Sequence, residues 1–175
     1  MEEFNNRILS IRKGWKYTRQ GKDYTPFIHD KIKFNINYYL TRVSLFFNFN
    51  SALVLDADDL GTTVALKAIG FEVKNIHIPN YYANKTEYKS MKKHLRDVAA
   101  FPISIDDYVD AIIDSTSTQS FRSQLRIKYN ETNFETKSNL IQPLPSRPKP
   151  FNFIYLDYCS KYKTNKDTIE KIFNN

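Results

Sequence analysis

Residues 51–80 constrain the fold of this chain more than any other stretch. Residues 52–55 form a short apolar run that is typical of a buried parallel strand. Residues 62–69 are compatible with a helix, and residues 73–78 alternate apolar with polar side chains as a second strand does. A strand, a helix and a strand in so short a stretch predict a βαβ unit with a right-handed crossover.

Polar residues follow both strands of this unit. Asp56 ends the first strand and opens an acidic turn over residues 56–61, while Asn80 follows the second strand. Gly70 and Pro79 mark the expected ends of the helix and of the second strand. Because the carboxyl ends of parallel strands form the ligand crevice of an open α/β sheet, the sequence predicts a crevice at this polar edge.

A long helix is predicted ahead of the first strand. Thr25 and Pro26 suit a helix start, as a cap residue followed by a proline in the first turn. From there apolar side chains recur every three to four residues and define one apolar face. That face consists of Ile28, Ile32, Ile36, Tyr39 or Leu40, Val43 and Phe47.

Two further strands and three further helices are expected after the βαβ unit. The strands are predicted at residues 98–105 and 151–156, and the helices at about residues 85–95, 108–113 and 167–173. Ser104 or Asp106 suits the cap of the helix at residues 108–113. The pattern predicts an α/β, Rossmann-like fold, in which helices flank a mostly parallel sheet.

An insertion is expected at about residues 115–150. Residues 124–129 alternate apolar with polar side chains, and with residues 133–137 they suggest the two strands of a hairpin or extended arm. Several prolines between residues 139 and 150 favour a stiff linker. A mobile surface loop is the other interpretation of this insertion.

The residues that follow the four strands form a recognisable series. Asp56-Ala57-Asp58-Asp59-Leu60-Gly61 follows the first strand, Asn80 the second, Ile105-Asp106 the third and Asp157-Tyr158-Cys159 the fourth. This series resembles the first half of a class I S-adenosylmethionine-dependent methyltransferase. The resemblance covers about residues 51–159 and implies a methyltransferase-type domain at residues 51–175, behind a basic N-terminal segment and leading helix at residues 1–50.

The resemblance implies roles for the residues of this series. Those that would hold S-adenosylmethionine are Asp56, Asp58, Gly61, Asn80 and Asp106. Asp157 and Tyr158 would line the catalytic side of the crevice, where the methyl group is transferred. Cys159 has no evident histidine partner, so a structural thiol is favoured over a nucleophile.

The acidic turn departs from the family pattern. It has one glycine where the family has two or three, and it carries three carboxylates. Carboxylates repel phosphate, which argues against a dinucleotide pyrophosphate or a P-loop, and they suit the cationic sulfonium and amino groups of S-adenosylmethionine. No pair of histidines has the spacing of metal ligands, and no metal site is predicted.

Two other functions remain open at this point. The reduced glycine content suits a catalytically inactive subunit that binds nucleic acid or a protein partner. The segment Leu55-Asp56-Ala57-Asp58 is also similar to the Asp-x-Asp of haloacid-dehalogenase-type phosphatases, with Asp106-Asp107 as a magnesium pair. The threonine of that motif comes two residues too late here, at Thr62.

Charge and composition suggest partners and a compartment. The 175-residue chain has a net charge of +7, which favours a polyanion such as nucleic acid. Its basic N-terminal segment is either a nucleic-acid-binding arm or a leader that packs Trp15 and Tyr17 on the domain. No apolar run approaches the roughly 20 residues of a membrane span. A single cysteine and no signal-peptide pattern indicate an intracellular protein, cytoplasmic or nuclear.

Overall fold

The computed structural model describes most of the chain. The described residues are 1–15, 18–19, 22–23, 31–56, 60–79, 93–101, 103–131, 144, 146–156 and 162–174. The helices are α1 (Glu2–Ile11), α2 (Lys31–Phe46), α3 (Gly61–Ala68), the 3₁₀-helix η1 (Val73–Asn75), α5 (Ile105–Ile113), α6 (Thr118–Glu131) and α7 (Tyr162–Asn174). The strands are β1 (Thr18–Arg19), β2 (Lys22–Asp23), β3 (Ala52–Val54), β4 (Ile76–Pro79), β5 (Ala99–Phe101) and β6 (Phe153–Tyr155).

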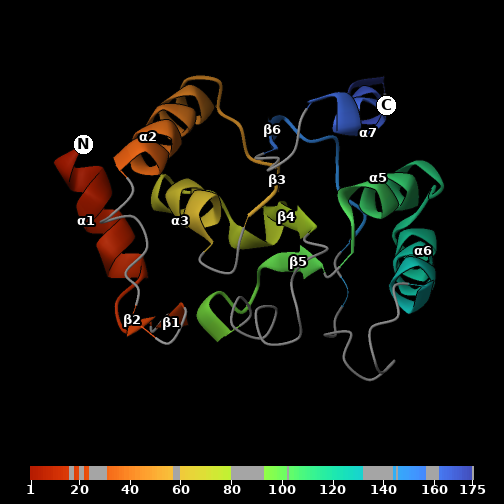
Figure 1. Cartoon of the computed structure of the whole chain (residues 1–175), viewed down its shortest axis with the longest axis horizontal. Coiled ribbons are helices and arrows are strands. Elements are labelled where there is room, and N and C mark those ends of the chain that lie inside the picture. Colours follow the sequence, from red (N-terminus) through yellow and green to blue (C-terminus); the bar gives the residue numbers. More distant parts are fainter. Residues whose placement is uncertain are drawn as a thin grey trace.

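The main sheet has four strands in the order β5-β4-β3-β6, and all of its pairings are parallel (Figure 1). Ala52 in β3 pairs with Ile76 in β4 on one side and with Phe153 in β6 on the other. From β3 the chain moves outward to β4 and β5, then returns across the sheet to β6. The predicted Rossmann-like α/β fold is confirmed, and its topological switch point lies between β3 and β6.

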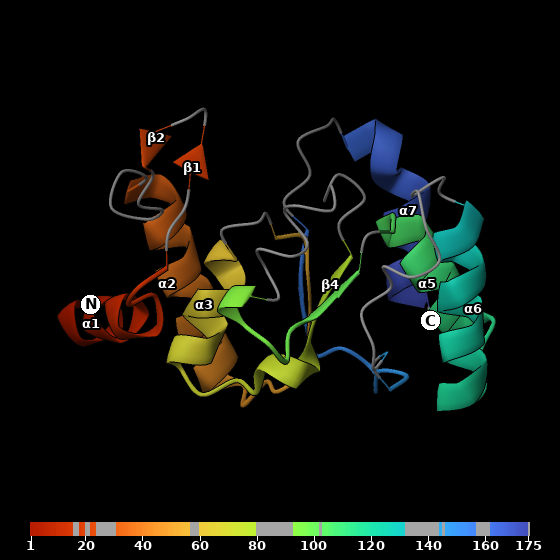
Figure 2. The same cartoon turned by 90° about the horizontal axis from the view of Figure 1, so that it is seen from below.

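Two hydrophobic cores lie on opposite faces of this sheet. Ala52 and Val54 of β3 belong to the core that packs against α1, α2 and α3, whereas Leu53 belongs to the core formed with α5, α6 and α7. Figure 2 shows these two groups of helices on either side of the strands. Because alternate residues of a strand point to opposite faces, a strand covered on both sides is apolar throughout, as β3 is.

The predicted βαβ unit is confirmed, and its helix ends as expected. The N–H of Phe71 donates to the carbonyl of Leu66 at 3.1 Å, and the N–H of Gly70 donates to that of Lys67 at 3.0 Å. This pair of bonds is a Schellman motif, which requires a left-handed residue. Gly70 supplies it with φ of 104°. The second strand is shorter than predicted, because residues 73–75 form η1 and the extended part begins at Ile76.

The hairpin predicted at residues 124–129 is wrong. These residues lie within α6, and the proposed second strand at residues 133–137 lies outside the described residues. Phe121, Leu125 and Tyr129 are buried in the core beside α5. Their spacing of four residues is that of one helix face. The alternating pattern of a strand would have placed Ile127 on the same face as Leu125 and Tyr129, but Ile127 is exposed. Packing against α5 therefore selected the helix.

The N-terminal segment begins with a helix that belongs to the core. Phe4 and Ile8 of α1 are buried, and the guanidinium of Arg7 donates to the carbonyl of Ala68 in α3 at 3.2 Å. Trp15 stacks on His94 with 4.5 Å between ring centroids, which confirms the packing interpretation for this residue. Tyr17 lies outside the described residues. Of the helices described here, none has the length and apolar character that crossing a membrane requires.

The predicted apolar face of α2 lies on the outside of the molecule. Asn37, Thr41 and Ser44 are the buried residues of this helix. The exposed ones include Ile32, Ile36, Tyr39, Val43 and Phe46, together with Phe47 just beyond the helix. An apolar helix face normally packs on the core, so this orientation is opposite to the usual one.

Candidate functional site

The candidate site lies at the carboxyl edge of the sheet, at the switch point. Three of the predicted residues fall in the described part of the chain: Asp56 after β3, Gly61 in α3 and Asp106 in α5. The other four, which are Asp58, Asn80, Asp157 and Tyr158, lie outside the described residues. What the geometry shows therefore concerns the turn from β3 into α3 and the start of α5.

Asp56 caps helix α3. One oxygen of its carboxylate accepts the N–H of Thr62 at 3.2 Å, and the other accepts the N–H of Thr63 at 2.7 Å. The first N–H groups of a helix have no partner within the helix, and their dipoles favour a negative charge. Asp56 is itself buried, so the carboxylate and the helix terminus satisfy each other away from water.

Two neighbouring threonines at this terminus differ in their hydrogen bonds. The hydroxyl of Thr62 donates to Oδ1 of Asn37 at 3.2 Å and ties α3 to α2. The hydroxyl of Thr63 is buried and has no hydrogen-bond partner within the described structure. The turn thus holds an unused polar group next to the Asp56 carboxylate, and a bound molecule or water that reached it would gain a hydrogen bond.

These two threonines should respond in opposite directions to the same substitution. Thr63→Val is expected to raise the free energy of unfolding by about 1 kcal/mol, since it removes a buried hydroxyl that lacks a partner. Thr62→Val is expected to lower it by about 1 kcal/mol or more, because the buried oxygen of Asn37 would lose its donor. Urea unfolding of both variants measures the difference; equal losses in the two would contradict the assigned bonding.

Gly61 was expected to be the glycine of the turn, but the structure places it in helix α3. Gly61 is the first residue of α3, and the left-handed residue is Leu60, with φ of 52° and ψ of 40°. A left-handed bulky residue is unusual and is retained only where its surroundings hold it. Leu60 is fully buried in the core on the α3 side of the sheet. Its side chain anchors the turn from inside, so apolar packing holds the left-handed conformation of this residue.

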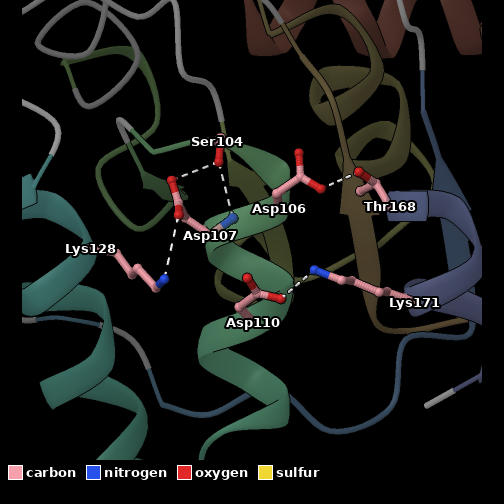
Figure 3. A network of polar contacts seen from close by, with 7 residues as sticks. All are labelled: Ser104, Asp106, Asp107, Asp110, Lys128, Thr168 and Lys171. Atoms are coloured by element: carbon pink, nitrogen blue, oxygen red, sulfur yellow. Dashed lines mark hydrogen bonds and ion pairs between the residues drawn. The ribbon is translucent and has the colours of Figure 1, made fainter. Parts of the chain in front are cut away.

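Asp106 takes part in a network that joins α5 to the helices on either side (Figure 3). One of its carboxylate oxygens accepts the hydroxyl of Thr168 in α7. Two further acidic residues of α5 contact lysines of the neighbouring helices. The ammonium group of Lys171 in α7 donates to the carboxylate of Asp110 at 2.9 Å. The ammonium group of Lys128 in α6 lies 3.7 Å from the carboxylate of Asp107.

The helix cap in this network is Ser104, one of the two residues predicted for that position. Its hydroxyl accepts the N–H of Asp107 at 3.0 Å. Asp106 therefore has a described role in holding α7 against α5. Its predicted role at the adenine remains an expectation.

A buried histidine–tyrosine pair is present that the sequence analysis did not identify. Nδ1 of His77 in β4 lies 2.5 Å from the hydroxyl of Tyr108 in α5, and Phe101 and Phe151 lie around the imidazole. Burial lowers the pKa of His77 to about 4 and raises that of Tyr108. His77 is therefore neutral at pH 7. In the sequence it occupies the polar position of an alternating strand, which indicated exposure, but β4 is covered on both faces.

A cavity of about 400 Å³ lies at the opposite edge of the sheet. It is lined by residues that precede β3, among them Ser44, Leu45 and Phe49, and by residues that precede β4, among them Phe71 and Asn75. Since it lies at the amino ends of the strands, it is separate from the crevice. In the described ranges no three His, Cys, Asp or Glu side chains gather in a way that could hold a metal ion.

The fold defines the class of this chain, a Rossmann-like α/β protein with an all-parallel four-stranded sheet, and Asp56 caps α3 at the switch point of that sheet. Comparison with models of known protein families, with curated proteins and with solved structures gives no match.

Proposed function

We propose that this chain is a methyltransferase-like domain that binds S-adenosylmethionine at the switch point of its sheet. The observation that carries the proposal is the position of Asp56, which follows the central strand β3 where the strand order reverses between β3 and β6. Ligands of open α/β sheets bind at such points. The start of α3, capped by Asp56, lies at this point.

The charge of the turn favours this ligand over a nucleotide phosphate. Asp56 already occupies the N–H groups of Thr62 and Thr63, to which a phosphate would otherwise bind. Asp58 and Asp59 add two further carboxylates to the turn. A negative turn attracts the sulfonium and the amino group of S-adenosylmethionine, whereas it repels polyphosphates.

The remaining roles follow from the ends of the other strands. When bound, S-adenosylmethionine supplies an electrophilic methyl group for an acceptor nucleophile. Asn80, after β4, would hydrogen-bond the ribose hydroxyls. Asp157 and Tyr158, after β6, would lie on the acceptor side, where the carboxylate could take a proton from the nucleophile. The net charge of +7 favours nucleic acid as the acceptor, and the single cysteine favours the cytoplasm or nucleus.

Calorimetric titration with S-adenosylmethionine and S-adenosylhomocysteine tests the proposal. We expect both to bind the wild-type chain, and we expect Asp58→Asn and Asn80→Ala each to weaken binding about tenfold through the loss of one polar contact. Asp97→Asn is the matched control, because Asp97 is exposed and precedes β5 at the opposite edge of the sheet. ATP is the control ligand and should bind more weakly than either.

Absence of heat and of a thermal shift at millimolar S-adenosylmethionine would remove the proposal. A second function would then be favoured, that of a catalytically inactive subunit which binds nucleic acid or a protein. One observation supports this second function. Both carboxylate oxygens of Asp56 accept N–H groups of α3, so the structure accounts for this residue without a cofactor. Binding to RNA or DNA that persists without cofactor and above about 200 mM salt would support that function.

A further inference from the structure

Helix α2 exposes a regular line of large apolar side chains. We call this line the α2 stripe; it consists of Ile32, Ile36, Tyr39, Val43 and Phe46, which are between 40% and 79% exposed. The intervals between them are four, three, four and three residues. Isolated apolar residues on a surface are common, but a continuous line of five marks a site of interaction.

The orientation of α2 is fixed by contacts on its other side. Oδ1 of Asn37 accepts the buried Thr62 hydroxyl, and Phe34 and Tyr38 pack on Phe4 of α1, with 5.8 and 5.4 Å between ring centroids. Figure 1 shows α2 lying beside α1 and α3. Turning the stripe inward would break these contacts, so the fold holds the stripe toward solvent.

The spacing of the stripe identifies the kind of surface it fits. Intervals that alternate between four and three residues average 3.5, which is the a/d repeat of helices that pack side by side. The stripe is also narrow, as a coiled-coil seam is, whereas a helix that lies on a membrane has a wide apolar face. At 16 residues α2 is about 24 Å long, enough for two heptads of contact. The matching occupant is another helix.

The charges beside the stripe identify the partner further. The sequence of α2 contains Lys31, Lys33 and Arg42 and no Asp or Glu. With the stripe at a and d, Arg42 falls at position g, so an exposed cation lies beside the seam. Charges at e and g select partners by complementarity. A second copy of α2 would offer the same cations and no acid.

We propose that the α2 stripe is the docking site for an amphipathic helix of a partner protein, apolar at heptad spacing and acidic on the flank that meets Arg42. The site is separate from the candidate cofactor site, since the stripe lies on the exposed face of α2, whereas the contact of Asn37 with Thr62 lies on the buried face. Binding there goes beyond methyl transfer and does not depend on it.

A synthetic three-heptad peptide with Leu at a and d and Glu at e and g is the probe, labelled for fluorescence polarisation against the full chain. Its matched control peptide has Lys in place of Glu. We expect the acidic peptide to bind about fivefold more tightly than the basic one, because only it meets Arg42 with opposite charge. Arg42→Glu should narrow or reverse that preference.

Variants of the chain test the position of the site. Val43→Glu places a charge in the seam and should weaken binding of the acidic peptide at least about tenfold. Ile127→Glu is the matched control, because Ile127 is similarly exposed but lies on α6, on the other side of the sheet; it should bind as the wild type does. Circular dichroism checks that both variants are folded.

Three results would overturn the proposal. The first is that the acidic peptide does not bind, or binds no better than the basic one. The second is that sedimentation shows a dimer of the chain that Val43→Glu dissociates, which would make a second copy the occupant. The third is binding to anionic vesicles that Val43→Glu abolishes while neither peptide binds. S-adenosylmethionine titration of Val43→Glu reports the crevice separately and should match the wild type.

Discussion

Asp56→Ala is expected to lower the free energy of unfolding by about 3 kcal/mol. The substitution removes two charge-assisted hydrogen bonds at once and leaves the N–H groups of Thr62 and Thr63 without their acceptor. The loss is large because seven of the eight residues of α3 are buried, so water cannot readily replace the carboxylate. Urea unfolding followed by circular dichroism measures it.

Two companion variants make this expectation specific. Asp56→Asn keeps one acceptor oxygen and should lose about half as much. Asp97→Ala removes an exposed carboxylate and should change the free energy of unfolding by less than about 0.5 kcal/mol. If Asp56→Ala lost no more than Asp97→Ala, the cap would contribute nothing to stability. The same variants show why Asp56 is a poor residue for testing cofactor binding: its removal disturbs the fold first.

Acidification from pH 7 to pH 4 is expected to cost about 3 kcal/mol of stability through His77 alone. Burial lowers its pKa in the folded chain to about 4, against 6.5 when unfolded. As the pH falls below 6.5 the unfolded chain binds a proton that the folded chain does not. The contribution of His77 is therefore complete above pH 6.5 and is lost progressively toward pH 4.

A double variant isolates this effect. His77→Leu removes the titrating group, and Tyr108→Phe removes the hydroxyl that would otherwise lose its partner in the core. The free energy of unfolding, measured by urea titration at a series of pH values, should fall less steeply for the double variant than for the wild type. Parallel curves for the two proteins would show that His77 does not resist protonation in the folded state.

Local sequence signals were sufficient for the central part of the fold. The apolar run of β3, the Gly70 helix end, the Ser104 cap and the strand β6 were each predicted and are each present. In all of these cases the conformation depends on a few neighbouring residues: a run of apolar side chains, a glycine in a left-handed position or a side-chain cap. The parallel pairing of β3 with β4 was predicted as well, because a helix connects the two strands.

The place of Asp56 at the end of the first strand of the βαβ unit was predicted, but its structural role was not. The structure adds that its carboxylate caps α3. That role depends on the tertiary structure, since Thr62 comes six positions after Asp56 in the chain. The left-handed Leu60 could not be anticipated either, because it exists only where the surrounding core holds the side chain.

The sequence by itself determined which segments form the strands of the parallel sheet, because these depend on short runs of side chains. The tertiary structure alone decided which period residues 121–129 follow and which face of α2 points outward. In α6 the packing against α5 selected the helix. In α2 the apolar periodicity predicted that the stripe would face the core. The contacts of Asn37 with Thr62 and of Phe34 with Phe4 instead hold the opposite face against the core. Contacts between residues far apart in the chain decide such choices, and no local pattern contains them.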